Sequence, residues 1–525
     1  MNYAALFRAT LPETALEIAV LLVLVVDLGF LRKAAAKTRI AVAAVLGVAG
    51  CVAALWAVYA TAWDGFSASD GFLLVAWGSA PVAQIAILVL TALTLLLVTE
   101  SEFTRNPGEY VAVVLMAAAG GLLISAAQDL LVIFIGLELL SLGLYILTAF
   151  AKQSGKSAEA ALKYYLFGGM SAAFLLFGFS YLYGLTGTTS LAGIETAIFQ
   201  SGPTPLYYVA WILVVAGLGF KVAAVPFHLW APDTYEGAPA PAAAFIASVS
   251  KVASFALLLT FFGGTFFTIP NSRGYSEDEL NRHFSQYMAS GTHLIEIMLI
   301  VAVASMVVGN LAALAQTSVR RLLAYSAIAH AGYILLGVCP LPHSDPLPFS
   351  QAVGIADVAQ GLILHQTPVL YYILTYGLTT IGAFGVVGVV ERATGSDKLD
   401  SFLGLQKRNP LLAVVLLVLF LSLAGIPPLV GFWAKFNLFA AVLAAGAGPV
   451  PFALVALAVA FSAVSLYYYL QVLKRAYVLP AADITPIKVH PVTMTVLLTI
   501  AAAVVVSGCF PALLQGWIAA FYQTM

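Results

Sequence analysis

The sequence predicts an all-α polytopic membrane protein with about fourteen transmembrane helices. Hydrophobic residues make up 62% of its 525 residues and charged residues only 9%, and the mean hydropathy is +0.99. Soluble domains carry about 25% charged residues because water must meet a polar surface. A chain this poor in charge is therefore expected to have lipid as its main solvent. Long apolar stretches recur along its whole length.

Fourteen stretches reach the roughly 20 apolar residues that a helix needs to cross the hydrocarbon core. They cover residues 12–31, 40–63, 72–99, 109–127, 129–150, 161–186, 206–229, 240–264, 294–314, 319–339, 368–391, 411–440, 451–476 and 492–520. Longer polar connections are expected at 265–293 and 340–367. Basic residues follow the first stretch instead of preceding it, so we expect a retained helix and not a cleaved signal peptide.

The distribution of basic residues predicts how the spans are oriented. If the N-terminus lies outside, seventeen of the 23 basic residues fall in the inside loops, and three, Arg8, Arg273 and Arg282, fall outside. This asymmetry is what the positive-inside rule requires. An even number of spans then places both termini on the outside face.

The composition also argues against several classes of function. The formal net charge of -1 gives no basic surface for nucleic acid. Cys51, Cys339 and Cys509 lie far apart in apolar runs, so neither a disulfide framework nor a zinc or iron–sulfur site is indicated. No dinucleotide-binding fingerprint follows a strand. We therefore expect no cofactor in this chain. The energy for any work that the protein does has to come from partner subunits or from an ion gradient.

Four charged residues lie well inside predicted spans: Glu138, Lys221, Lys251 and Lys435. A lysine at mid-membrane costs about 2.5–3.5 kcal/mol on insertion scales, so it is retained where something offsets the cost or uses the charge. One interpretation is that these residues form static ion pairs that hold the bundle together. Three lysines cannot all pair with one glutamate, however, and a lysine whose partner moves can bind and release a proton. We therefore favour a role in carrying protons across the bilayer.

Prolines predict breaks in spans 7 and 12. Pro226 follows Lys221, while Pro427 and Pro428 precede Lys435. Proline removes a backbone N–H and disrupts the preceding turn, so the freed carbonyls must face protein or water. Broken helices at matching places in two halves indicate an inverted repeat and its ion path. The two spans lie an odd number of spans apart, which inverts the topology of one relative to the other.

Three further residues are candidate relay groups. His228 lies at the end of span 7 beside an expected polar loop, 230–236, and His330 lies within span 10. Histidine titrates near neutral pH, which suits a proton relay, but a hydrogen-bonded packing role explains each histidine equally well. Lys163, at the start of span 6, is either a relay member or an interface residue whose ammonium reaches the headgroups.

Six motifs together are more specific than any one of these residues. They are GLELLSLGLY (136–145), ALKYYLFG (161–168), KVAAVPFHLWAPD (221–233), YEGAP (235–239), YSAIAHAGY (325–333) and GIPPLVGFWAKF (425–436). The chain resembles, through nearly its whole length, the antiporter-like membrane subunits of NADH–quinone oxidoreductase, respiratory complex I. The chain is similar to one branch of that family in three features: the sequence of span 5, the lysine in span 12 and an end soon after span 14.

The resemblance implies a domain organisation and a set of partners. The implied domains are three N-terminal helices in 1–108, two inverted five-helix half-channels in 109–264 and 265–490, and a last helix in 491–525. NADH, FMN, iron–sulfur clusters and quinone would be bound by partner subunits. The implied partners are the other membrane subunits of the complex, including its sister antiporter-like subunits. The implied location is the inner membrane of a bacterial cell.

The resemblance also implies that Glu138, Lys221, Lys251 and Lys435 are the pumping residues, with no redox centre in this chain. In the expected mechanism, quinone reduction elsewhere perturbs a Glu138–Lys221 pair. The proton on Lys221 then passes through Lys251 toward Lys435. Two alternatives remain open: a subunit of a multi-subunit cation/proton antiporter, and a membrane scaffold that does not pump.

Overall fold

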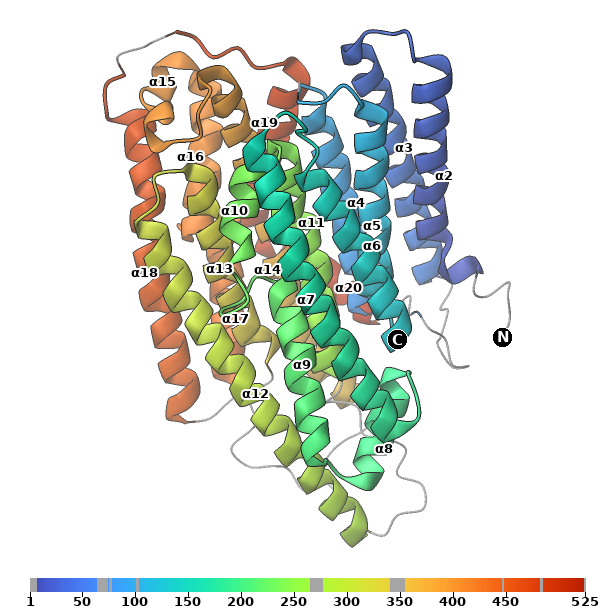
Figure 1. Cartoon of the computed structure of the whole chain (residues 1–525). Helices are drawn as coiled ribbons and strands as arrows, with labels where there is room; N and C mark the ends of the chain where they lie inside the picture. Colours follow the sequence, from blue (N-terminus) through green and yellow to red (C-terminus); the bar gives the residue numbers. More distant parts are fainter. Residues whose placement is uncertain are drawn as a thin grey trace.

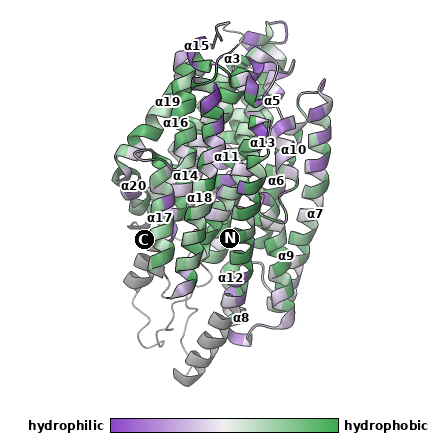
Figure 2. Ribbon diagram, turned by 90° about the vertical axis from the view of Figure 1, so that its left-hand side faces the viewer, coloured by the Kyte–Doolittle hydropathy of each residue, from purple (hydrophilic) through white to green (hydrophobic). Residues whose placement is uncertain are grey.

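The chain is a single bundle of long helices, as the sequence predicts. The computed structural model describes residues 7–63, 74, 78–100, 103–264, 277–339, 355–445, 448–481 and 485–523. Within these ranges the regular structure is helical, and β-type pairing is limited to isolated bridges. The helices stand side by side, with α2 and α3 at one side of the bundle and α18 at the other (Figure 1). Figure 2 shows hydrophobic residues along most of the helix lengths, as contact with lipid requires.

Eleven of the described helices are long and apolar enough to cross a membrane, and three shorter apolar helices accompany them. The main elements are α2 (Leu11–Val25), α3 (Ala36–Trp63), α4 (Ser79–Val98), α5 (Pro107–Ala126), α6 (Leu130–Thr148), α7 (Gly155–Thr186), α8 (Leu191–Ser201), α9 (Pro205–Lys221), α10 (Trp230–Gly237), α11 (Ala240–Leu259), α12 (Glu277–Leu314), α13 (Val319–Val338), α14 (Ile355–Thr394), α15 (Leu405–Arg408), α16 (Pro410–Ala424), α17 (Val430–Ala445), α18 (Pro449–Tyr477), α19 (Pro491–Cys509) and α20 (Pro511–Gln523). The expectation of a polytopic all-α membrane protein is confirmed.

Helix ends follow local sequence signals. Proline stands at the first turn of α5, α9, α16, α18 and α19, where its missing N–H leaves no hydrogen bond unmade. Ser154, Ser318 and Asn409 each accept a hydrogen bond from a backbone N–H of the helix that follows. These signals explain why most predicted spans begin within a few residues of the observed helices.

Several predicted boundaries were wrong. The expected polar loop at 230–236 is the helix α10, and α8 also lies where no helix was expected. The last predicted span, 492–520, is two helices, α19 and α20, because Pro511 interrupts it. The predicted connections 265–293 and 340–367 are shorter than expected, because α12 already begins at Glu277 and α14 at Ile355. The parts 265–276 and 340–354 lie outside the described residues.

Helix α11 is the centre of the bundle. Nearly all of its residues are buried, and it packs against α14, α4 and α5. Helix α10 lies between α7 and α13. Helix α11 is therefore enclosed by protein, and a polar group on α11 has to find its partner inside the bundle.

Candidate functional site

The break predicted in span 7 is present. Helix α9 ends at Lys221, and α10 begins at Trp230. In the intervening segment Ala223 has a positive φ of 56°, a conformation that residues other than glycine seldom adopt. The segment is held from outside by Ser305 on α12, whose hydroxyl accepts a hydrogen bond from the Val225 N–H at 2.9 Å. Pro226 lies within this segment and is exposed.

The break predicted in span 12 is also present. Helix α16 ends at Ala424, Gly425 follows with a φ of 86°, and α17 begins at Val430. Glycine suits this left-handed position because it has no Cβ. Pro427 and Pro428 lie between the two helices. Both breaks leave the last carbonyls of the preceding helix without helical partners.

Lys251 and Lys221 are placed at the first break. The Lys251 ammonium donates to the carbonyl of Val222, which directly follows α9, and the residue is only 2% exposed. Lys221 is 7% exposed, and its ammonium donates to the Ser141 hydroxyl on α6. The partial negative charge at a helix C-terminus stabilises a nearby cation, which explains how Lys251 is tolerated in the core.

Lys435 repeats this arrangement at the second break. Its ammonium donates to the carbonyls of Leu423 and Ala424, at 3.2 and 3.1 Å, and to the Ser462 hydroxyl at 2.9 Å. The same ammonium lies 5.4 Å from the centre of the Tyr333 ring. Lys435 is 5% exposed. As at the first break, carbonyls freed by the interruption of a helix receive the hydrogen bonds of a buried lysine.

None of the three buried lysines forms an ion pair within the part of the chain that the structure describes. All of the hydrogen-bond partners of their ammonium groups are neutral oxygens. Static ion pairs, the alternative considered from the sequence, therefore do not explain their retention. An ammonium on neutral acceptors can lose its proton without leaving an unpaired carboxylate behind.

Glu138 is not placed as the sequence suggested. It lies on α6 between two exposed residues, Ile135 and Leu142, so its side chain is only half-buried at the side of the bundle. It forms no ion pair with Lys221 among the described residues; Ser141, one turn further along α6, takes that contact. Sequence reasoning missed Ser141, although its spacing of three residues from Glu138 puts both on one face of the helix.

His330 lies at the centre of a tyrosine network. Its Nδ1 lies 2.9 Å from the Tyr372 hydroxyl and its Nε2 lies 3.3 Å from the Tyr469 hydroxyl. The Tyr469 hydroxyl is also hydrogen-bonded to Ser326. Hydroxyls and imidazoles both donate and accept protons, so this chain of groups can pass a proton in either direction. Sequence reasoning missed these tyrosines, because a tyrosine in an apolar span is typical of a residue that only packs in the core.

His228 and Lys163 stand apart from this network. His228 lies half-buried in the segment between α9 and α10, and its Nδ1 has no hydrogen-bond partner among the described residues. Lys163 forms ion pairs with Glu159 at 2.7 Å and with Asp233 at 2.8 Å. The structure therefore places Lys163 in a second group of charges and not beside the buried lysines.

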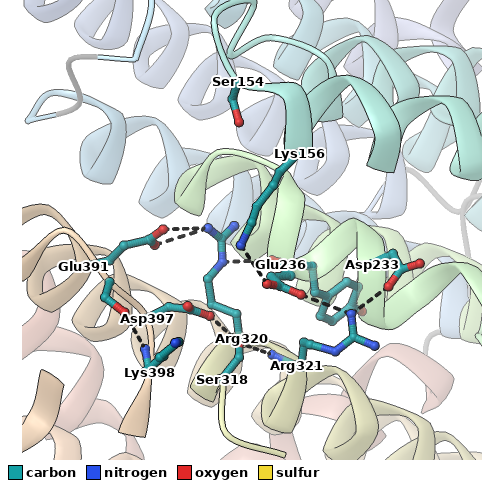
Figure 3. A network of polar contacts seen from close by, with 12 residues as sticks. Ser154, Lys156, Asp233, Glu236, Ser318, Arg320, Arg321, Glu391, Asp397 and Lys398 are labelled. Atoms are coloured by element: carbon teal, nitrogen blue, oxygen red, sulfur yellow. Dashed lines mark hydrogen bonds and ion pairs between the residues drawn. The ribbon is translucent and has the colours of Figure 1, made fainter. Parts of the chain in front are cut away.

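This second group, the ionic cluster, joins α7, α10, α13 and α14. It consists of Lys156, Lys163, Asp233, Glu236, Arg320, Arg321 and Glu391. Figure 3 shows Arg321 reaching both Asp233 and Glu236, and Arg320 reaching Glu391. A cavity of about 390 Å³, lined in part by Lys156, Glu236, Arg320 and Glu391, opens beside it. The charged residues in its lining and this volume suit water.

The ionic cluster should be insensitive to pH across the physiological range. Burial alone would raise the pKa of Asp233 and Glu236, but hydrogen bonds from Lys163, Arg321 and Lys156 outweigh burial and leave both pKa values below their ordinary range. A carboxyl whose pKa is lowered on folding contributes stability above its unfolded pKa and loses it as the pH falls through the folded pKa.

We therefore expect the difference in melting temperature between the wild type and Asp233→Asn to stay constant from about pH 5 to 8 and to shrink below about pH 4. Thermal unfolding in detergent across this range measures it. A difference that disappears near neutral pH would contradict the assignment.

No group of three or more histidine, cysteine, aspartate or glutamate side chains that could hold a metal ion occurs among the described residues. The charged groups that the structure does bring together are the buried lysines at the helix breaks and the ionic cluster. The lysines inside a bundle of apolar helices define the class of protein: a polytopic membrane protein with charged groups in its core.

The comparisons with known proteins identify the family. The family described as "NADH:quinone oxidoreductase/Mrp antiporter, TM" matches residues 127–271, 280–341 and 354–462. NADH-quinone oxidoreductase subunit N 2 of Acidobacterium capsulatum is 46% identical over 99% of both chains. Subunit N 1 of Roseiflexus castenholzii is 40% identical over 83% of this chain and 78% of that one. The chain belongs to this family, in the branch of the subunit N proteins.

Solved structures agree with this assignment. A chain of respiratory complex I from Thermus thermophilus, solved with bound aureothin, is 31% identical, with a TM-score of 0.73 over 96% of this chain and 98% of that one. A chain of the Mrp complex from a Dietzia species has the same fold, with a TM-score of 0.73 over 98% of this chain and 97% of that one, at 21% identity.

Proposed function

We propose that this chain carries protons across a bacterial inner membrane as a subunit of a NADH–quinone oxidoreductase. The family and the names of its relatives support membership of such a complex. Partner subunits would then oxidise NADH and reduce quinone, using FMN and iron–sulfur clusters, and sister antiporter-like subunits would lie beside this one. The observation that carries the proposal is the set of three buried ammonium groups held by neutral oxygens.

The path in this proposal runs from Lys221 through Lys251 to Lys435. Ser141 and Val222 supply the acceptors at the first break, and α16 supplies them at the second. His330 and its tyrosines lie on α13, α14 and α18 and would relay protons between Lys251 and Lys435. His228 and Lys163 are not needed for this path. Two half-channels in 109–264 and 265–490, with both termini outside, are part of the same proposal.

Glu138 is the acidic switch of the proposed path. Because it lies at the side of the bundle, its charge is open to a neighbouring subunit, and it lies one turn of α6 before Ser141, the hydrogen-bond partner of Lys221. A change at Glu138 would therefore alter the electrostatic energy of the proton on Lys221. This arrangement supports an electrostatic perturbation across space in place of a direct ion pair.

Neutral substitutions at Glu138 and Lys221 test the proposed function. Glu138→Gln and Lys221→Met should each lower the number of protons translocated per second by roughly tenfold in reconstituted complex, because each removes a titratable group. The rate of proton translocation is measured in proteoliposomes during NADH oxidation, by the quenching of a pH-sensitive dye. Glu296→Gln is the matched control, because Glu296 is an exposed carboxylate on the apolar helix α12. Full proton yield in both test variants would refute the proposal.

The description of the matching family also names antiporters, so a cation/proton antiporter subunit is the second candidate function. The same proteoliposomes distinguish the two. Proton movement that requires a sodium gradient and proceeds without NADH would favour the antiporter. Proton movement that requires NADH and quinone would favour the first proposal.

A further inference from the structure

Two residues of α7 contact helix α10 on one side. Lys163 forms an ion pair with Asp233 at 2.8 Å. The next residue, Tyr164, stacks on Trp230, with ring centroids 4.3 Å apart and planes 5° from parallel. Neighbouring residues of α7 therefore hold the beginning and the middle of α10, through an aromatic stack and a charge-assisted hydrogen bond.

Two arginines of α13 contact the same short helix from the other side. Arg321 reaches Asp233 at 2.6 Å and Glu236 at 3.0 Å. Arg320 donates to the carbonyl of Tyr235 at 2.8 Å and to that of Ala238, which satisfies the C-terminal end of α10. Asp233 thus accepts from Lys163 on α7 and from Arg321 on α13, and Figure 3 shows the second of these contacts.

The position of α10 determines the position of the first break. The Trp230 indole N–H donates to the carbonyl of Phe220 at 2.9 Å, one residue before Lys221. Two residues further on, the carbonyl of Val222 accepts the hydrogen bond of Lys251. A shift of α10 would therefore move the backbone from Phe220 to Val222, which carries both Lys221 and the carbonyl that binds Lys251. Proton transfer requires donor and acceptor within hydrogen-bond reach, directly or through one water.

We propose that Asp233 is a positioning residue for proton transfer between Lys221 and Lys251, acting by fastening α10 to α7 and α13. The inference rests on the proposed function and adds to it a site outside the buried axis. Asp233 touches neither lysine, so its effect is transmitted through α10 and the segment 222–229.

Loss of the Asp233 charge leaves no cation stranded. Lys163 keeps Glu159 as a partner, and Arg321 keeps Glu236. Partly exposed ion pairs contribute modestly to stability, so Asp233→Asn should lower the melting temperature slightly and should still assemble. What the substitution removes is the bridge between the two helices. Its effect is therefore expected in the kinetics and not in the amount of complex.

Asp233→Asn in the assembled complex should slow NADH-driven proton translocation by about two- to tenfold and should raise the solvent deuterium isotope effect, because proton transfer becomes rate-limiting. Asp233→Glu should restore both values in part. Asp400→Asn is the matched control: Asp400 pairs with Arg475 at 3.4 Å and is 82% exposed, outside the ionic cluster. A structural defect alone would lower the yield of complex and leave the isotope effect per assembled complex unchanged.

Wild-type rate and isotope effect in Asp233→Asn would overturn the inference, as would a loss of rate that matches a loss of assembly. If Asp233→Asn does not assemble, Lys163→Gln tests the α7 side alone and should raise the isotope effect in the same direction. An unchanged isotope effect there would also overturn it. Glu138→Gln and Lys221→Met separate the two proposals: full translocation in both variants refutes the proposed function, whereas its loss there together with a normal Asp233→Asn refutes only the positioning role.

Discussion

Replacing Lys251 by methionine should leave an assembled complex that translocates protons at least about tenfold more slowly, because a buried proton carrier is lost. Assembly should survive because methionine fills a similar volume and a buried ammonium is costly to keep. The one partner left behind is the carbonyl of Val222. Lys251 is the most buried of the three lysines, at 2% exposed, and lies on the central helix α11.

Proton translocation per assembled complex, in proteoliposomes with NADH and a quinone, measures the effect. Lys407→Met is the matched control, since Lys407 is exposed on the short helix α15. If Lys251→Met pumps as fast as the control, Lys251 is a structural residue and the path through α11 is wrong.

Replacing Gly431 by alanine should disrupt the second break and with it the site of Lys435. A Cβ at this position would lie 1.8 Å from the carbonyl oxygen of Ser422, far inside van der Waals contact. The two arms of the break, α16 and α17, touch at this point, so they must move apart. Overpacking in a well-packed core costs about 1–3 kcal/mol and occasionally more. The shift also draws Lys435 away from the carbonyls of α16.

We expect Gly431→Ala to lower both the melting temperature of the complex and the rate of proton translocation per assembled complex. Thermal unfolding in detergent and the proteoliposome assay measure the two effects. Gly169→Ala, at a helical glycine of α7 with no neighbouring atom within 4 Å, should change neither. A variant at Gly431 with wild-type stability and rate would show that the two arms of the break can separate at no cost.

The sequence predicted the membrane spans well because hydropathy is a property of each segment by itself. It failed where a helix is short and polar: α10 reads as a loop because its stability comes from Tyr164, Arg320 and Arg321, which lie on other helices. The interruption at Pro511 was missed because the apolar stretch 492–520 continues through the proline. Both helix breaks at the buried lysines were predicted, because prolines mark them.

The partners of the charged residues could not be predicted in the same way. Which residue on this face of α6 contacts Lys221 is set by tertiary packing, and Ser141 takes that contact. The split between buried lysines and the ionic cluster has the same origin: Lys163 resembles a snorkelling lysine until α10 brings Asp233 to it. A backbone carbonyl that accepts a hydrogen bond is not marked by any residue type in the sequence. Its only signal is the proline that interrupts the helix and frees the carbonyl.

That use of the backbone has an evolutionary consequence. Lys251 and two of the three contacts of Lys435 rest on main-chain carbonyls, and no substitution of a side chain can delete a carbonyl. Mutation can remove the lysine or reroute the chain, but it cannot retune the acceptor by exchanging one functional group for another. Selection on these two positions therefore acts on the path of the chain through each break, and changes of residue type around them are tolerated as long as that path is kept.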